Sequence, residues 1–345
     1  MVQALIEELK QRKEVLDGIT IDTIYFGGGT PSLLNIGELQ EIIGCIYNEF
    51  QVSGKPEITL EANPDDLILT YVSDLNKSGI NRLSIGVQSW DEEDLIKLNR
   101  KHSAIQAEKA INNALESGIK NISIDLIYGL PGMNPDKWKQ NLKKAFSFNI
   151  THLSAYHLTY EAGNVMDYMR IKKRIKPVEE EESEDEFRIL IQEAGNHRFK
   201  QYELSNFSKE GFESRHNSSY WERVHYLGIG PSAHSFIGKT RSWNISNNRK
   251  YTEGIFSGTK ISESEVLSET EEFNEYIMTG FRMRKGIDMV HILKNFGEEK
   301  MNYFLKNIEN YKQEGLTEGS GNRIWLTSKG MFLSDRIISD MMIVE

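Results

Sequence analysis

The sequence holds a single cysteine, Cys45, and this scarcity excludes proteins built on disulfides or on cysteine-bound metals. One thiol can form neither an intrachain disulfide nor a cysteine cage for a metal, so a cytoplasmic location is expected. No apolar run is long enough to cross a bilayer, and the first residues lack the apolar stretch of a signal peptide. Basic residues are outnumbered by acidic ones, 41 to 51, and the net charge of −10 argues against a general nucleic-acid binder but not against a local basic patch. Cys45 falls in a helical pattern, which predicts a buried structural thiol.

What the first half of the chain does contain is an alternation of strand-like and helix-like segments. Several helical patterns end at a glycine, such as Gly79 or Gly118, as expected for helix C-termini. Strand-like composition occurs in residues 23–26, 57–62, 82–88, 121–130 and 152–160. Strands separated by helix-length crossovers predict a parallel sheet, either a barrel or a doubly wound sheet.

Glycines or polar residues stand at or near the C-terminal end of every predicted strand. They are Gly27–Gly29, Glu61, Gln88, Asp125, and the group Tyr156, His157 and Thr159. Strands of a parallel sheet are normally continuous apolar runs. Isolated buried polar groups could explain one such strand but not a whole series. The pattern is typical of a (β/α) barrel, which builds its site from the C-terminal ends of its strands.

The segment TIYFGGGTPSLL, residues 23–34, has three consecutive glycines directly after the first strand, so three successive positions have no side chain. Glycine reaches positive φ without steric cost, so a tight turn is one explanation. A close approach of some group to the bare backbone is the other, and the residues alone leave both open.

An amphipathic helical pattern, residues 2–16, precedes the first predicted strand. In a parallel βα protein such a helix normally crosses over from an earlier strand. We therefore expect a partial parallel (β/α) barrel that lacks its first strand and the loop after it. A helix added ahead of a complete sheet is the alternative.

The alternation breaks at about residue 161. Residues 177–197 predict a helix with carboxylates in its first turn, and residues 201–236 are rich in aromatics, histidines and glycines. The tail from about residue 265 reads helix, helix, helix, hairpin, helix, an order similar to a winged helix, but its charge is acidic. We predict a partial barrel at 1–165, an extension at 166–260 and a mainly helical winged-helix-like domain at 261–345.

An ordered set of motifs resembles the radical S-adenosylmethionine (SAM) family of oxygen-independent coproporphyrinogen III oxidase-like proteins, and most of all its HemW-type haem chaperones. The motifs are YFGGGTPSLL, EANPDDL, GINRLSIGVQSWDEEDLIKLNRKHS, DLIYGLPG, YELSNF, RHNSSYW and YLGIGPSAHSF. They cover essentially the whole chain and stand in the family's order and spacing. GGGTP alone would be a weak signal, but the ordered set is a specific one.

The resemblance implies a SAM site and answers the question raised by the three glycines. Bare backbone at Gly28, Gly29 and Thr30 would lie along the methionine end of SAM. By motif, the other SAM-binding positions are Glu61, Gln88, Arg100 and Asp125. An arginine can bind a carboxylate in bidentate fashion, and carboxylates or an amide can bind ribose hydroxyls and an ammonium group. Arg100 on its own could equally be a surface cation at a helix end.

The sequence departs from the family in one respect. The resemblance implies a [4Fe–4S] cluster held by a CxxxCxxC loop after the first strand, and Cys45 is the only thiol. One thiolate cannot hold that cluster, so SAM cleavage is not expected from this chain. Because the chain starts where the family's first crossover helix starts, we expect that the segment carrying the cysteines is missing. A natural paralogue without a cluster is the alternative.

The resemblance also implies haem as a ligand and a recipient haemoprotein as a possible partner. In RHNSSYW the haem candidates are His216, Tyr220 and Trp221, with His216 the first candidate for an axial ligand. Further candidates are His157, His225 and His234. Two other functions stay open: oxidative decarboxylation of coproporphyrinogen III by a radical SAM enzyme, and a fragment that has the fold without activity.

Overall fold

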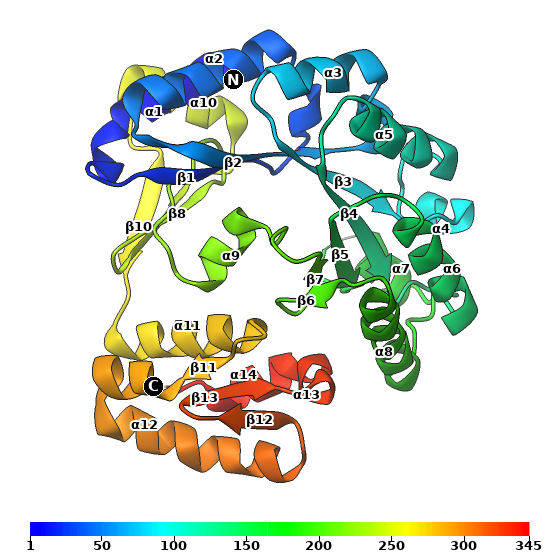
Figure 1. Ribbon diagram of the computed structural model, residues 1–345. Helices are drawn as coiled ribbons and strands as arrows, with labels where there is room; N and C mark the ends of the chain where they lie inside the picture. The colour runs from blue at the N-terminus through cyan, green and yellow to red at the C-terminus, as the bar shows by residue number, and fades with distance from the viewer. Residues whose placement is uncertain (164, 345) are drawn as a thin grey trace. The chain divides into compact units, whose positions relative to one another are not determined.

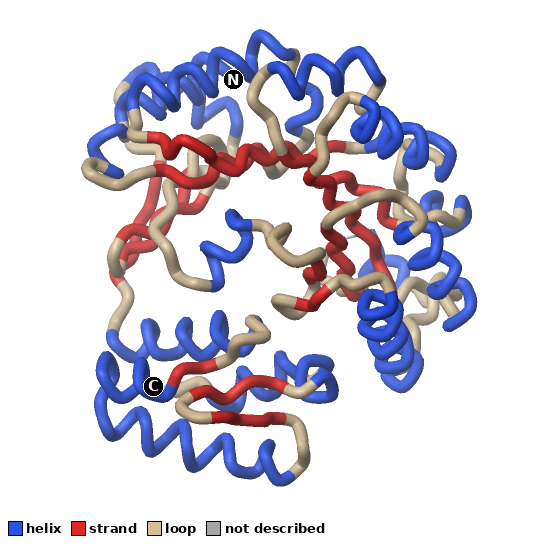
Figure 2. The backbone as a smooth tube through the Cα atoms, viewed as in Figure 1, coloured by secondary structure: helices blue, strands red, loops and turns tan. Residues whose placement is uncertain are grey.

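A computed structural model describes residues 1–163 and 165–344 as a mixed α/β protein (Figures 1 and 2). Its main sheet has seven strands in the order β1-β2-β3-β4-β5-β7-β6. The first five strands are β1 (Ile21–Phe26), β2 (Val52–Ala62), β3 (Arg82–Gln88), β4 (Asn121–Tyr128) and β5 (His152–His157). All of the strand-like runs predicted from the sequence are therefore strands.

The pairing from β2 to β5 is parallel, as predicted. Its register places Glu61 beside Ser84 and Asp125 beside Ser154, so polar residues of neighbouring strands are aligned. The last two strands, β7 (Asn206–Ser208) and β6 (Lys200–Gln201), are antiparallel to their neighbours. Only four residues of the YELSNF segment connect β6 to β7, which is too short for a parallel crossover between these two strands. The fold prediction is confirmed, with this antiparallel edge added.

The helices of the first half follow the strands in alternation (Figure 1). They are α1 (Val2–Gln11), α2 (Ile36–Glu49), α3 (Leu69–Lys77), α4 (Glu92–Lys97), α5 (Ala104–Glu116) and α6 (Pro135–Phe146). Capping boxes begin α2 at Asn35 and α5 at Ser103, which satisfies backbone amides that a helix start leaves free. All of these helices except the short α4 bury several apolar residues or a pair of them, and Cys45 lies buried on α2 as predicted.

The second half adds smaller elements. Next along the chain are α7 (Val165–Ile171), α8 (Glu180–Asn196), α9 (Arg215–Trp221) and α10 (Asn248–Ser257). A separate antiparallel sheet contains β8 (His234–Ile237), β9 (Thr240–Asn244) and β10 (Ser262–Val266) in the order β10-β9-β8. The remaining elements are α11 (Glu269–Arg282), β11 (Ile287–Asp288), α12 (Met289–Gln313), β12 (Thr317–Ser320), β13 (Arg323–Leu326), α13 (Ser328–Phe332) and α14 (Ser334–Met341). Gly297, with φ 81°, breaks α12 into two, so this region has the predicted order of helices and hairpin.

Two compact units share the chain. One contains Met1–Ile24, Leu34–Glu57 and Arg215–Glu345, and the other contains Tyr25–Leu33 and Ile58–Ser214. Strands β1 and β2 therefore contribute residues to both units. The domain limits expected at 1–165, 166–260 and 261–345 stay a prediction. No helix in the described part of the chain is long and apolar enough to span a membrane.

Glu8 on α1 organises the first unit although it is almost completely buried. Its carboxylate accepts hydrogen bonds from the Gly230 amide (2.8 Å), the Asn244 amide group (2.7 Å) and the Tyr251 hydroxyl (2.6 Å). Arg12 adds an ion pair at 3.1 Å. A buried charge is tolerable only with such partners. Part of the YLGIGPSAHSF motif is thereby explained by packing against α1.

Candidate functional site

The three glycines after β1 have two different structural roles. Gly28 and Gly29 adopt positive φ values of 70° and 51°, a conformation that glycine reaches at no steric cost. Gly27 does not, but a Cβ there would lie 2.5 Å from Cε1 of Tyr25 and 3.1 Å from Oε1 of Glu61. Gly27 thus makes room for two neighbouring side chains, and the next two glycines turn the backbone.

Glu61, near the end of β2, faces this turn. Its Oε1 accepts a hydrogen bond from the Tyr25 hydroxyl at 2.7 Å, and its Oε2 accepts one from the Gly28 amide at 3.2 Å. Burial and the adjacent Glu61 charge raise the pKa of Tyr25 well above its ordinary value, so the phenol remains a donor. The carboxylate therefore ties the glycine turn to the second strand.

Asp125 on β4 lies on the same side of the sheet as Glu61. The Ser84 hydroxyl donates to its Oδ1 at 3.2 Å. Burial, followed by the charge of Glu61, raises the pKa of Asp125 to about 6 despite hydrogen bonds from Ser84 and Ser154. Two carboxyl groups are thus held near each other, and one of them takes up a proton just below neutral pH.

Gln88 ends β3 in a conformation that is unusual for its residue type. Its φ is 68°, its pairing with β4 is shifted after Ile85, and it is buried. A non-glycine residue at positive φ stores backbone strain, which is often found at functional sites. Gln88 and Asp125 line one pocket of about 310 Å³. The other lining residues are Ile127, Tyr156, His157, Leu158 and Thr159.

Arg100 follows the helix after β3. Desolvation lowers the pKa of its guanidinium, while the charges of Asp125 and Asp65 act in the opposite direction. Within residues 1–163 and 165–344 this guanidinium makes no ion pair and no side-chain hydrogen bond. A cation near Asp125 is thus available to an anionic ligand group.

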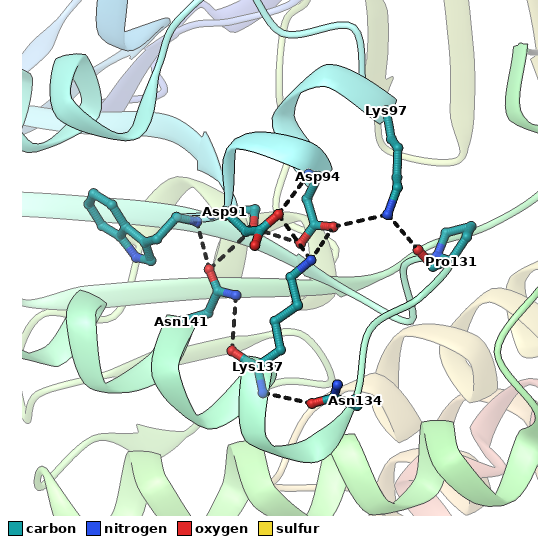
Figure 3. A network of polar contacts seen from close by, with 9 residues as sticks. Asp91, Asp94, Lys97, Pro131, Asn134, Lys137 and Asn141 are labelled. Carbon is teal, nitrogen blue, oxygen red and sulfur yellow. Dashed lines mark hydrogen bonds and ion pairs between the residues drawn. The ribbon is translucent and has the colours of Figure 1, made fainter.

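A polar network anchors the loop that connects Gln88 to Arg100 (Figure 3). Asp94 on α4 is fully buried and accepts hydrogen bonds from Ser89 at 3.0 Å and from Lys137 on α6 at 2.8 Å. The Trp90 amide donates to Asn141 on α6 at 2.6 Å.

Lys97, at the end of α4, extends this network to the loop after β4. Its Nζ donates to the Pro131 carbonyl at 3.0 Å and lies 3.7 Å from Asp94 (Figure 3). The loops after β3 and β4 are therefore held to each other and to α6, which fixes where Gln88 and Arg100 lie relative to Asp125.

The structure thus brings most of the predicted SAM residues together at one end of the sheet, since Gly28 contacts Glu61, the charge of Glu61 acts on Asp125, and the charge of Asp125 acts on Arg100. Thr30 follows Gly29, and its carbonyl accepts a hydrogen bond from the Leu33 amide at 3.2 Å. Sequence reasoning missed Tyr25 and Ser84. Alternation along β1 and β3 was the available signal, because every second residue of a strand shares a face.

The predicted haem residues lie on α9. Both ring nitrogens of His216 are hydrogen bonded, Nδ1 to the Thr23 hydroxyl at 2.7 Å and Nε2 to the Tyr220 hydroxyl at 2.9 Å. The Arg282 guanidinium lies 4.4 Å from the centre of the Trp221 ring. Iron could bind His216 only after one of these hydrogen bonds breaks.

The residues of this sequence do not fit a [4Fe–4S] cluster. The sole thiol, Cys45, lies on α2 with its Sγ 3.8 Å from the Ile6 carbonyl oxygen, and burial raises its pKa. A cluster needs several thiolates. Among the described residues there is also no group of three or more histidine, cysteine or carboxylate side chains arranged to hold a metal ion.

The chain is similar in sequence to proteins and domains of one family. A model of the Radical SAM superfamily matches residues 2–145, and a model of the HemN C-terminal domain matches residues 267–333. The Heme chaperone HemW of Bacillus subtilis is 31% identical over 319 residues, which cover 92% of this chain and 84% of that protein. The Heme chaperone HemW of Lactococcus lactis is 28% identical, with 99% and 90% covered.

Among solved structures, the coproporphyrinogen III oxidase HemN from Escherichia coli is similar with a TM-score of 0.82. The match covers 99% of this chain and 82% of that one at 23% sequence identity. A structural likeness at this identity shows the fold and leaves the reaction open.

Proposed function

Because the chain belongs to the radical SAM family that includes the Heme chaperone HemW of Bacillus subtilis, we propose that it binds haem and delivers it to haemoproteins. The similarity to HemW proteins over most of their length carries this proposal. The structural likeness to HemN concerns the fold, so coproporphyrinogen III oxidation is the less favoured function.

We further propose that SAM binds at the strand ends. The Arg100 guanidinium, which has no ion pair or side-chain hydrogen bond among the described residues, suits the carboxylate of its methionine part, and Gly28, Gly29 and Thr30 offer backbone for a close approach. Glu61, Gln88 and Asp125 suit hydroxyl and ammonium groups. The strained turn at Gln88 and the left-handed glycines are the observations that favour a ligand here.

SAM supplies a sulfonium group, whose reductive cleavage in this family needs an electron from a [4Fe–4S] cluster. The thiols of this chain do not fit that cluster. The role proposed for its own residues is therefore binding: Arg100 holds the carboxylate, and Glu61 orders the glycine turn through the Gly28 amide.

A haem titration tests the proposed function. The purified chain should develop a shifted Soret band on addition of haemin and should lose that band to an apo-haemoprotein added afterwards. Absence of haem binding by the folded chain would refute the chaperone function.

A further inference from the structure

The histidines of the chain differ in how their imidazole rings are engaged. Of the 8 histidines, only His234 and His291 make no ring hydrogen bond within residues 1–163 and 165–344. Haem iron binds an unprotonated ring nitrogen that has no other partner. His225, for comparison, accepts a hydrogen bond at Nε2 from the Gly238 amide at 3.1 Å, which leaves only its Nδ1 for a metal.

His234 is exposed at the start of β8 and lies in register with Trp243 on β9. Their ring centres are 6.2 Å apart and their planes differ by 31°. Because alternate residues of a strand share a face, Phe236 lies on the same side of β8 as His234. The free imidazole thus stands at the edge of an aromatic surface.

Two tyrosines continue that surface. Tyr226 forms a bridge with Phe236, and their ring centres are 6.4 Å apart. Tyr220 packs edge-on against Tyr226, with ring centres 4.7 Å apart. Phe236 itself is buried, and the Arg223 guanidinium lies 5.3 Å from the centre of its ring, so the aromatic face is defined here by the more accessible rings of Tyr220, Tyr226, His234 and Trp243. Flat apolar rings of this kind can support a porphyrin.

We propose that His234 is the axial ligand of the haem iron and that the aromatic face supports the porphyrin ring. The inference rests on the proposed function and names the residues that would carry it. It leaves His216 in its hydrogen bonds with Thr23 and Tyr220 and assigns the RHNSSYW segment a supporting role through Tyr220.

The decisive experiment compares single histidine variants of the full chain in haemin titrations. We expect His234→Ala to lose the Soret and visible bands of histidine-ligated haem and to weaken haem binding by about tenfold or more. His291→Ala is the matched control, since its ring is also free of hydrogen bonds but stacks on Tyr276 in the helical C-terminal region. His291→Ala and His216→Ala should keep the spectrum of the unaltered chain.

Metal-free protoporphyrin IX separates ligation from stacking. It offers the same ring without iron, so its binding, read by fluorescence, should survive His234→Ala. Trp243→Leu should weaken binding of both haem and protoporphyrin, whereas Trp325→Leu, on the C-terminal hairpin, should change neither. His234→Met should give a spectrum distinct from those of both the unaltered chain and His234→Ala, because methionine also ligates haem iron.

Different outcomes would refute the assignment of His234 as axial ligand and the proposed chaperone function. If the unaltered chain binds no haem, the chaperone proposal fails and the ligand assignment fails with it. If it binds haem and a well-folded His234→Ala keeps the histidine-ligated spectrum, the assignment alone is wrong. Loss of that spectrum in His216→Ala instead would return the axial position to His216.

Discussion

Replacing Asp125 by asparagine should stabilise the protein at pH 8 and leave its stability unchanged near pH 4. The pKa of Asp125 is raised from 3.8 to about 6 in the folded protein, chiefly by burial and then by the charge of Glu61. Ionising this carboxyl therefore costs free energy only in the folded state. At 1.36 kcal/mol per pKa unit, the loss of stability amounts to about 3 kcal/mol.

The pH window follows from the two pKa values. Asp125 does not lower the free energy of unfolding below about pH 4. Its destabilising effect grows as the pH rises to about 6 and stays constant above that. Asparagine carries no charge, and its oxygen can still accept from the Ser84 hydroxyl, which now donates to Asp125 at 3.2 Å. The variant should thus gain up to about 3 kcal/mol over the unaltered chain at pH 8.

Urea unfolding followed by circular dichroism at pH 4, 6 and 8 measures this difference. Asp17→Asn, at an exposed position, is the matched control and should show no such trend. Glu61→Gln should reduce the effect, because it removes the second cause of the raised pKa. An Asp125→Asn advantage that does not change with pH would refute the reasoning, as would an unaltered chain that is the more stable at pH 8.

Other positions give further expectations. Arg100→Leu should weaken SAM binding, measured by calorimetry, by about 10- to 100-fold because charged hydrogen bonds are lost, and Arg284→Leu, at an exposed position, should not. If both variants bind alike, Arg100 does not contact SAM. Gly27→Ala should push Tyr25 aside and cost about 1–3 kcal/mol of stability in a thermal melt; an unchanged melting temperature would show that the turn yields easily. Glu8→Ala should cost about 3–5 kcal/mol, since it leaves buried donors and Arg12 without their partner, and a loss below 1 kcal/mol would mean that water replaces the carboxylate.

The sequence predicted the parallel strands well because their signal is local. Arg82–Gln88 was delimited correctly, since its apolar run is bounded by polar and turn-forming residues. It could not predict that Gln88 turns to positive φ, because that conformation is imposed by neighbours on β4 and by the anchored loop after it.

Hydrogen bonds between residues far apart in the chain could not be predicted from the sequence either. The motif around His216 favoured it as the haem ligand, but both of its ring nitrogens are hydrogen bonded, to the hydroxyls of Thr23 and Tyr220. Nothing in the local pattern of α1 indicated that Glu8 would be buried, since Gly230, Asn244 and Tyr251, which donate to it, are more than two hundred positions away. Such pairings depend on the completed fold.

The Glu8 network also determines at what point of synthesis α1 can complete its packing. Tyr251 is 243 residues further along the chain than Glu8. At translation rates of roughly 5–20 residues per second, about 12–50 s pass between the polymerisation of the two residues. During most of that interval the Glu8 carboxylate has only Arg12 as a partner, because Gly230, Asn244 and Tyr251 have not yet been made, so α1 cannot complete its packing. Ribosome-bound chains that end before residue 251 should therefore leave α1 open to protease, and chains that extend well beyond it should protect the helix.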